Sequence, residues 1–200
     1  MAGFTPVSKN GEKMSDYEIL FNKAKKFHGH VCGGIVLGTR LTIAGLRELG
    51  MDPHQHQHNL IVYMEIDRCG ADAVQAITGC SLGHRSLKFM DYGKFAATFV
   101  DTATGKAVRV AVDEKDRAKH DKLEKEDMLR LLGEIPEPEI LKIEHVQIAI
   151  PKDDIPGFPL EKAKCSVCGE QIMDNRHIVV GGKVMCKNCG TKSYYTVIPS

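Results

Sequence analysis

Two Cys-x-x-Cys pairs near the C-terminus limit what this chain can fold into more than any other feature. Cys165 and Cys168 form the first pair, and Cys186 and Cys189 form the second, with residues 169–185 between them. Two pairs at this spacing are typical of a structural zinc site, in which four thiolates form a closed tetrahedron. A redox or disulfide role is the alternative, which two matched pairs in one short segment disfavour. We therefore expect a small zinc-stapled module that is not the place of catalysis.

Composition sets the size and the general class of the protein. The 200 residues are 42% hydrophobic, which is enough for one full domain and a small appendage. A formal net charge of +1 gives no bulk attraction to nucleic acid, anionic membranes or acidic substrates. No apolar run approaches the roughly 20 residues of a membrane helix, and residues 1–10 lack the apolar stretch of a secretory signal. The seven cysteines, four of them assigned to metal, suit a reducing compartment, so we expect a cytoplasmic protein.

Residues 1–150 are predicted to form an α+β core domain. A capping box over residues 15–18 opens a helix that continues to about Phe27, with Leu20, Ala24 and Phe27 facing inward. Further helices are expected over residues 34–49, 71–78 and 120–132. Strands are expected over residues 60–66, 95–99, 107–112 and 141–150. These elements do not alternate regularly, which favours α+β over a doubly wound sheet.

The expected helix over residues 34–49 contains unusually small side chains in its interior. Gly38, Ala44 and Gly45 lie there, and two of them weaken helix propensity. We interpret them as positions where another part of the chain packs closely.

The C-terminal region is predicted to be a linker followed by a zinc finger. Residues 151–159 hold three prolines and a glycine, and we assign residues 151–164 to the linker. Residues 165–200 begin with a cysteine knuckle. A hairpin follows, with arms at residues 178–180 and 183–185 and a Gly181-Gly182 turn. A short helix starting at the second cysteine pair would complete a treble-clef fold.

A second group of metal-binding residue types lies before the helix over residues 34–49. His28, His30 and Cys32 occupy alternate positions, so an extended backbone would project them to one side. Imidazole and thiolate are good ligands for zinc, iron or nickel. The start of the helix would also stabilise a Cys32 thiolate. The alternative is structural: His28 caps the preceding helix, His30 is a satisfied structural histidine, and Cys32 is buried as a small hydrophobe.

A third group follows the strand over residues 60–66. Cys69 lies between this strand and the next helix, where ligand sites often form. Asp72 lies in the first helical turn, where a carboxylate favours the helix dipole, and this capping role is its simpler interpretation. Cys80 follows the helix, and a Cys69–Cys80 disulfide is possible, although a cytoplasmic setting favours free thiols or ligands. We interpret two other polar groups as solvated surface: His54, His56 and His58, and the charged run over residues 114–127.

The chain resembles the E-subunit family of formylmethanofuran dehydrogenase in three stretches and in its trailing four-cysteine finger. The stretches are residues 28–34, 69–83 and 91–94, and the resemblance covers roughly residues 15–200. It implies an α+β core domain, an accessory treble-clef zinc finger and a homodimer. The family is named after a molybdenum or tungsten enzyme that reduces carbon dioxide onto methanofuran and carries its redox cofactor on other subunits.

The resemblance also implies a cleft site in the core domain that holds a metal. The shared motif residues correspond here to His28, His30, Cys32, Cys69, Asp72, Cys80 and Lys94. The chain departs from the family pattern twice, with Gly33 where proline is common and His84 where lysine is common. The glycine could loosen the start of the helix, and His84 adds a possible ligand or proton carrier.

Two hypotheses for function follow, and the sequence leaves open whether the protein is an enzyme. The first is a metal-dependent protein of one-carbon or redox metabolism that binds or converts a small molecule. Its candidate core ligands are His28, His30, Cys32, Cys69 and Cys80, and its candidate catalytic residues are Cys32, His30, Cys69 and Lys94. Lys94 would hold an anionic group, and a second transition metal would accompany the zinc of the finger. The second is a non-enzymatic metal-handling or assembly module whose finger contacts a protein or nucleic acid.

Overall fold

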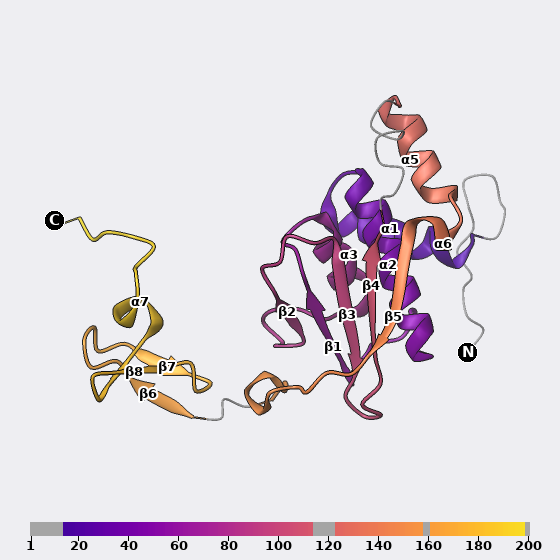
Figure 1. The fold of residues 1–200 in the computed structure, drawn as a ribbon. Helices are drawn as coiled ribbons and strands as arrows, with labels where there is room; N and C mark the ends of the chain where they lie inside the picture. Colours follow the sequence, from indigo (N-terminus) through magenta and orange to yellow (C-terminus); the bar gives the residue numbers. More distant parts are fainter. Residues whose placement is uncertain (1–13, 114–122, 158–160, 199–200) are drawn as a thin grey trace. The chain divides into compact units, whose positions relative to one another are not determined.

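The computed structural model describes residues 14–113, 123–157 and 161–198. The chain divides into two compact units, residues 1–149 and 150–200. The larger unit combines helices with one sheet, and the smaller is built from short strands and turns (Figure 1). The α+β fold class is therefore confirmed.

A mixed five-stranded sheet organises the larger unit. Its order is β2-β1-β3-β4-β5, with β2 parallel to β1 and the other neighbours antiparallel. The strands are β1 (Leu60–Met64), β2 (Leu87–Phe89), β3 (Ala96–Asp101), β4 (Ala107–Val112) and β5 (Leu141–Val146). All five residues of β1, an interior strand between β2 and β3, are buried, as its continuous apolar run predicts.

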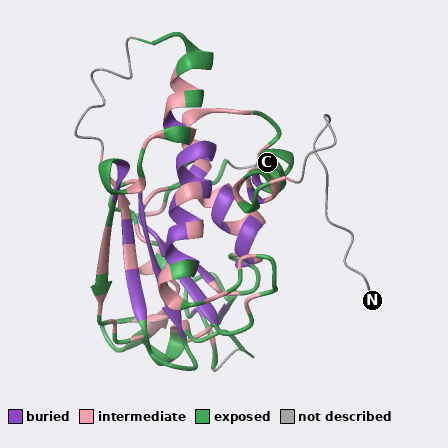
Figure 2. Cartoon of the chain, turned by 90° about the vertical axis from the view of Figure 1, so that its right-hand side faces the viewer, coloured by how far each residue is buried: buried purple, intermediate pink, exposed green. Residues whose placement is uncertain are grey.

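Helix α2 (Gly33–Leu49) packs directly on β3 and β4, and the other helices around it help to close the core. The described helices of this unit are α1 (Asp16–His28), α2, α3 (Cys69–Thr78), α5 (Lys125–Glu134) and the single turn α6 (Glu137–Ile140). The first three lie against the same face of the sheet (Figure 1). Buried residues follow the inner sides of these helices and the strands (Figure 2). Leu41 of α2 and Phe99 of β3 are fully buried at the centre.

Close packing explains the small residues of α2. A Cβ atom on Gly38 would lie 2.6 Å from the Cα of Gly70 at the start of α3. A Cβ on Gly45 would overlap the ring of Phe99. The prediction that another part of the chain approaches α2 closely is confirmed, and the nearest backbone is that of α3.

Several predicted boundaries differ from the structure. Helix α3 begins at Cys69, two residues before its predicted start, because Arg68 already has the extended backbone of an N-cap. Helix α5 begins at Lys125 and ends at Glu134, whereas we expected residues 120–132, of which 120–122 lie outside the described residues. Strand β5 ends at Val146 and not at residue 150. The inward orientation of Phe27 was wrong, since this side chain is 56% exposed. Helical periodicity indicates a face, but burial needs a neighbour that covers it.

The described part of the smaller unit contains two short antiparallel strand pairs and two helical turns. Strand β6 (Lys162–Lys164) pairs with β7 (Gln171–Met173), and β8 (Ile178–Val180) pairs with β9 (Lys183–Met185). The turn between β8 and β9 is Gly181-Gly182, both with positive φ, and α7 (Lys187–Gly190) follows. Both the hairpin arms and the short helix match the sequence analysis. The 3₁₀ turn η1 (Lys152–Asp154) and β6 lie within residues 151–164, which we expected to be a linker.

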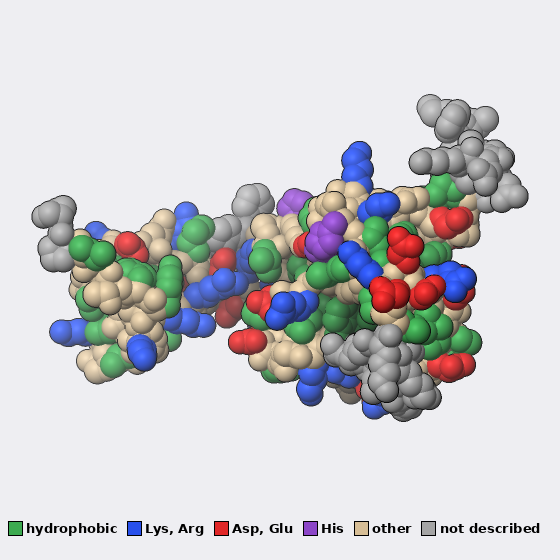
Figure 3. All heavy atoms as spheres, turned by 90° about the horizontal axis from the view of Figure 1, so that it is seen from above, with side chains coloured by type: hydrophobic (Ala, Val, Ile, Leu, Met, Phe, Trp, Pro, Cys, Tyr) green, Lys and Arg blue, Asp and Glu red, His purple; other side chains and the backbone are tan. Residues whose placement is uncertain are grey.

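The distribution of charged side chains over the surface is consistent with the low net charge. On the side of the larger unit shown in Figure 3, acidic and basic side chains are interspersed. Over the described ranges, no helix combines the length and apolarity that crossing a membrane requires.

Candidate metal centres

The four finger cysteines converge on one point. Their sulfur atoms all lie within 4.8 Å of one another. The first pair follows β6, and the second pair flanks the start of α7, whose N-cap is Cys186. The backbone N–H of Cys186 donates to the Sγ of Cys165 at 3.3 Å, and the N–H of Cys189 donates to the Sγ of Cys186 at 3.4 Å. Such N–H···S contacts stabilise thiolates.

A bound cation would stabilise the ionised form of these four cysteines. Backbone N–H donors, that of Cys186 first, lower the pKa of Cys165 to about 6. The hydrogen bond with Cys186, followed by burial, raises the pKa of Cys189 to about 12. Adjacent thiols therefore resist ionising together unless a positive ion offsets their charge. Four sulfurs within 4.8 Å of one another fit zinc, which would be held by Cys165, Cys168, Cys186 and Cys189.

The second cluster lies where α1 ends and α2 begins. His28 is the last residue of α1, and Gly29 adopts a left-handed φ of +89° that turns the chain. Cys32 is the N-cap of α2. The ligand atoms of His28, His30 and Cys32 lie within 4.8 Å of one another, and the two imidazole centroids are 4.3 Å apart. A turn after the helix gathers these side chains, and Cys32 at its end has an extended backbone, so both of the backbone forms that we considered for this segment occur.

Asp72 of α3 orients the first histidine. Its Oδ2 lies 2.7 Å from Nδ1 of His28, and its Oδ1 accepts a bond from Gln75 at 3.4 Å. The other ring nitrogen, Nε2, lies 3.7 Å from the Sγ of Cys32. A carboxylate on one nitrogen of a histidine leaves the other available to a metal or a thiol. The sequence placed Asp72 correctly in the first turn of α3, but only the structure shows its contact with His28.

Cys69 places a second thiol beside this cluster, although its Sγ is not one of the ligand atoms that all lie within 4.8 Å of one another. A Cβ on Gly34 would lie 2.9 Å from the Cβ of Cys69, 3.3 Å from its Sγ and 3.8 Å from the Sγ of Cys32. Burial raises the pKa of Cys69, and a hydrogen bond with Cys32 raises it further. The glycine at position 34 therefore lets the two thiols meet at the starts of α2 and α3. The donor set of two imidazoles and two thiols fits zinc or a similar transition metal.

Two other candidates, Cys80 and His84, belong to no group of metal-ligating side chains among the residues that the structure describes. Cys80 is 2% exposed and its thiol donates to the carbonyl of Leu60 at 3.5 Å, while burial raises its pKa. Lys94 and His84 are exposed. Their backbone N–H groups bond the carbonyl of Glu65 and the hydroxyl of Ser81. Three further histidines are exposed, as predicted, and belong to no ligand cluster of the described residues: His54, His56 and His58.

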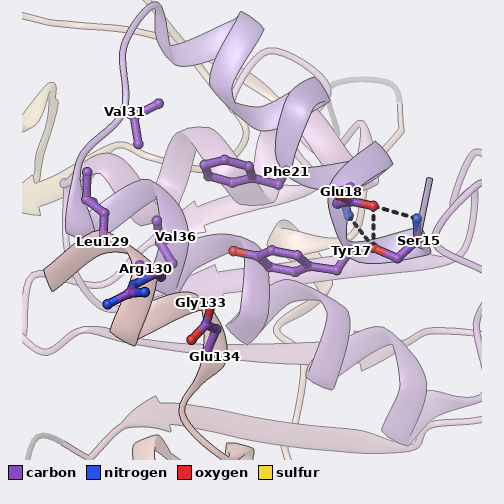
Figure 4. A pocket seen from close by; sticks show the side chains of 10 residues that line it. All are labelled: Ser15, Tyr17, Glu18, Phe21, Val31, Val36, Leu129, Arg130, Gly133 and Glu134. Atoms are coloured by element: carbon purple, nitrogen blue, oxygen red, sulfur yellow. Dashed lines mark hydrogen bonds between the residues drawn. The ribbon is translucent and has the colours of Figure 1, made fainter. Parts of the chain in front are cut away.

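A pocket of about 570 Å³ adjoins the segment that carries the core cluster (Figure 4). Tyr17 and Phe21 of α1 line it with parallel rings whose centroids are 5.7 Å apart. Leu129 and Arg130 of α5 lie across from them. Val31, between His30 and Cys32, also lines the pocket. Sequence reasoning missed this site, because α1 and α5 are far apart in the chain and neither carries a binding motif.

Two family models match the chain, one for each unit. The model described as "FmdE, Molybdenum formylmethanofuran dehydrogenase operon" matches residues 27–149. The "Prokaryotic dksA/traR C4-type zinc finger" matches residues 158–195. The first match includes all residues of the core cluster, and the second includes the four finger cysteines.

Individual proteins show the same likeness. A "Probable S-adenosyl-L-methionine-binding protein" of Archaeoglobus fulgidus is 33% identical over 207 residues, which cover 90% of this chain and 54% of that protein. The chain thus spans about half the length of this curated relative. A protein of Syntrophus aciditrophicus described as "tungsten formylmethanofuran dehydrogenase subunit e (fmde)-like", known from a crystal structure, has the same fold. The TM-score is 0.62 at 24% identity, covering 96% of this chain and 100% of that one. Because the first family model spans more than half of the chain, the protein belongs to the FmdE family and carries a C4-type zinc finger at its C-terminal side.

Proposed function

We propose that the core domain holds a transition metal that binds or activates a small-molecule ligand, while zinc in the finger is structural. The ligands of the core metal would be His28, His30, Cys32 and Cys69. The observation that carries this proposal is the contact of Asp72 with Nδ1 of His28 at 2.7 Å, with Nε2 facing Cys32 at 3.7 Å. Metal-binding histidines are usually held by such a carboxylate.

The chemistry of the site follows from how its residues are held. A metal with an open coordination position would polarise a heteroatom of the ligand or activate water. Asp72 orients His28, and Gly34 lets Cys69 approach Cys32. The pocket beside Val31 offers apolar and aromatic walls to the body of a small ligand. Lys94 is exposed and remains our candidate for binding an anionic group. A role in one-carbon or redox metabolism and a homodimeric assembly belong to the same proposal.

The second candidate function is a non-catalytic module in which the finger, with a treble-clef arrangement, contacts a partner protein. The finger favours this function because it exposes large apolar side chains. Val167 is 61% exposed, Val179 is 63% exposed and Tyr194 is 94% exposed. A small unit that exposes several large apolar side chains is a candidate for binding a partner through them. The name of the Archaeoglobus protein refers to binding of S-adenosyl-L-methionine. That name describes the whole protein, and this chain spans about half of its length.

Elemental analysis of the full-length chain tests the two functions. We expect two metal ions per chain in the wild type, and one in either His28→Ala or Cys165→Ser. Cys80→Ala is the matched control and should keep both, because this thiol bonds the Leu60 carbonyl away from the cluster. A wild type with a single zinc ion that His28→Ala retains would overturn the core metal and favour the second function.

A further inference from the structure

We infer that Cys32 and Cys69 are a site of reversible oxidation, at which an intrachain disulfide closes and removes the sulfur ligands of the core metal. The formation of the disulfide stands on the geometry of the two thiols alone. Its consequence for the metal rests on the proposed function. The site would respond to a small oxidant such as hydrogen peroxide.

The two sulfur atoms are close neighbours. They lie 3.8 and 3.3 Å from a single point, the place that a Cβ on Gly34 would occupy. A disulfide requires the sulfurs to approach to about 2.0 Å, which short side-chain rotations can supply when the backbones are already close. The chain is close here, since a Cβ on Gly34, two residues after Cys32, would lie 2.9 Å from the Cβ of Cys69.

The alternative pairing that the sequence left open, Cys69 with Cys80, has no such support. Cys80 lies beyond the C-terminal end of α3, whereas Cys69 is its first residue, so the length of a ten-residue helix separates them. Cys80 is also buried and bonded to the Leu60 carbonyl, while Cys32 and Cys69 are both partly exposed. A small oxidant therefore reaches Cys32 and Cys69 before it reaches Cys80.

The chemistry balances with hydrogen peroxide as the oxidant. The sulfur of Cys32 takes one peroxide oxygen, the O–O bond breaks, and the thiol proton leaves with the second oxygen as water. Cys32 is then a sulfenic acid. The sulfur of Cys69 attacks it, the S–O bond breaks, and the hydroxyl leaves with the Cys69 proton as a second water. Two thiols lose two electrons in all, and one peroxide gains them. A dithiol reductant reverses the reaction by thiol–disulfide exchange.

Peptide mass mapping of the full-length protein tests the disulfide directly. The protein, stripped of weakly held metal with its finger zinc retained, is treated with one equivalent of hydrogen peroxide, alkylated and digested without reduction. We expect a cross-linked peptide pair containing Cys32 and Cys69, which dithiothreitol abolishes. Because residues 69–80 contain two cysteines, fragment ions and the Cys80→Ala variant must confirm the partner. Cys80→Ala should still form the cross-link, and Cys69→Ser should not.

Two results would overturn the inference. One is a cross-link that maps to Cys80, and the other is oxidation of Cys32 to sulfinic acid with Cys69 left as a free thiol. The metal consequence has its own readout, which is the uptake of one equivalent of zinc before and after peroxide. If the disulfide forms but the reduced protein takes up no core metal, the proposed function fails while the oxidation site stands. If the reduced protein binds metal and the oxidised protein binds it equally well, the coupling between them is wrong.

Discussion

At the scale of single residues, the contact between Asp72 and His28 determines which ring nitrogen faces the cluster. The carboxylate occupies Nδ1 at 2.7 Å, so Nε2 is the nitrogen that points to the Sγ of Cys32. His28 is largely enclosed, with 11% of its side chain exposed. The ring is therefore held in one orientation before any metal arrives, which lowers the cost of binding.

The first prediction concerns this carboxylate. Asp72→Asn keeps the shape of the side chain but removes its charge from Nδ1 of His28. We expect the affinity for the core metal to fall by about 10- to 100-fold, the usual effect of losing such a partner. Competition with a chromogenic chelator would measure it. Asp67→Asn, at an exposed position before α3, is the control and should leave the affinity unchanged. An unaltered affinity in Asp72→Asn would contradict the orienting role.

The second prediction concerns Gly34. In Gly34→Ala, the new Cβ would lie 2.9 Å from the Cβ of Cys69, which cannot rotate away as the end of a side chain can. We expect a loss of about 1–3 kcal/mol in the free energy of unfolding, measured with urea, together with weaker metal binding. Gly133→Ala in α5 is the matched control, because the nearest atom to its new Cβ would be the Tyr17 hydroxyl at 3.7 Å. That variant should be stabilised by up to about 1 kcal/mol. Equal effects at both positions would show that close packing at Gly34 is unimportant.

At the scale of elements, an arginine of α2 bonds the C-terminal end of α5, which also packs on the core through apolar side chains. The guanidinium of Arg40 donates to the carbonyls of Leu132 at 2.7 Å and Ile135 at 2.6 Å. These carbonyls lie at the C-terminal end of α5, where helical carbonyls lack partners within the helix. Met128 and Leu132 also face Gly33 at the start of α2. Arg40 therefore helps to hold in position the residues of α5 that line the pocket.

The third prediction is that Arg40→Ala loosens α5 while the sheet stays intact. Two hydrogen bonds from a charged donor are lost, and we expect a loss of about 1.5–3 kcal/mol in stability. Hydrogen exchange should rise over residues 125–135 and stay slow in β3. Arg40→Lys is the conservative comparison, and it should restore part of the protection, because one ammonium cannot reproduce the two-pronged contact. Uniformly faster exchange in α5 and β3 would mean that Arg40 supports the whole domain.

At the scale of the whole molecule, the chain consists of two units whose stabilities have different origins. Residues 1–149 enclose an apolar core centred on α2 and the sheet. Among the described residues of the smaller unit, the buried hydrophobic ones are Cys165 and Ile172. A unit with so small a core needs another source of stability, and metal binding supplies it in modules of this kind.

The fourth prediction follows from this division. Cys165→Ser should lose one zinc ion per chain and unfold the finger, because the free energy of zinc binding is the folding energy of such a module. The core domain should remain folded. Hydrogen exchange would show lost protection over residues 162–190 and unchanged protection in β1 and β3. Val167→Ser, which replaces an exposed side chain inside the knuckle, should keep the zinc. Loss of protection across residues 16–112 in Cys165→Ser would contradict the independence of the two units.

The sequence by itself determined the features whose parts lie close together in the chain. The four finger cysteines and the β8–β9 hairpin could be predicted, because a few residues and a glycine turn set their geometry. The capping box of α1 is equally local, and Ser15 and Glu18 make both of its bonds. The extent of α5 was predicted less well, since periodicity continues past the residues that a neighbour can cover.

The core cluster was only partly predictable. His28, His30 and Cys32 were recognised by their residue types, but nothing local shows that Asp72 contacts His28 or that Cys69 reaches Cys32. Residues 33–68 separate the two stretches, and the tertiary packing of α2 against α3 unites them. The two helices can approach this closely because Gly34, Gly38 and Gly70 have no side chain to keep them apart. The sequence thus determined which residues are able to bind a metal. The approach of two helices decided which of them meet, because contacts between distant segments depend on how the whole core packs.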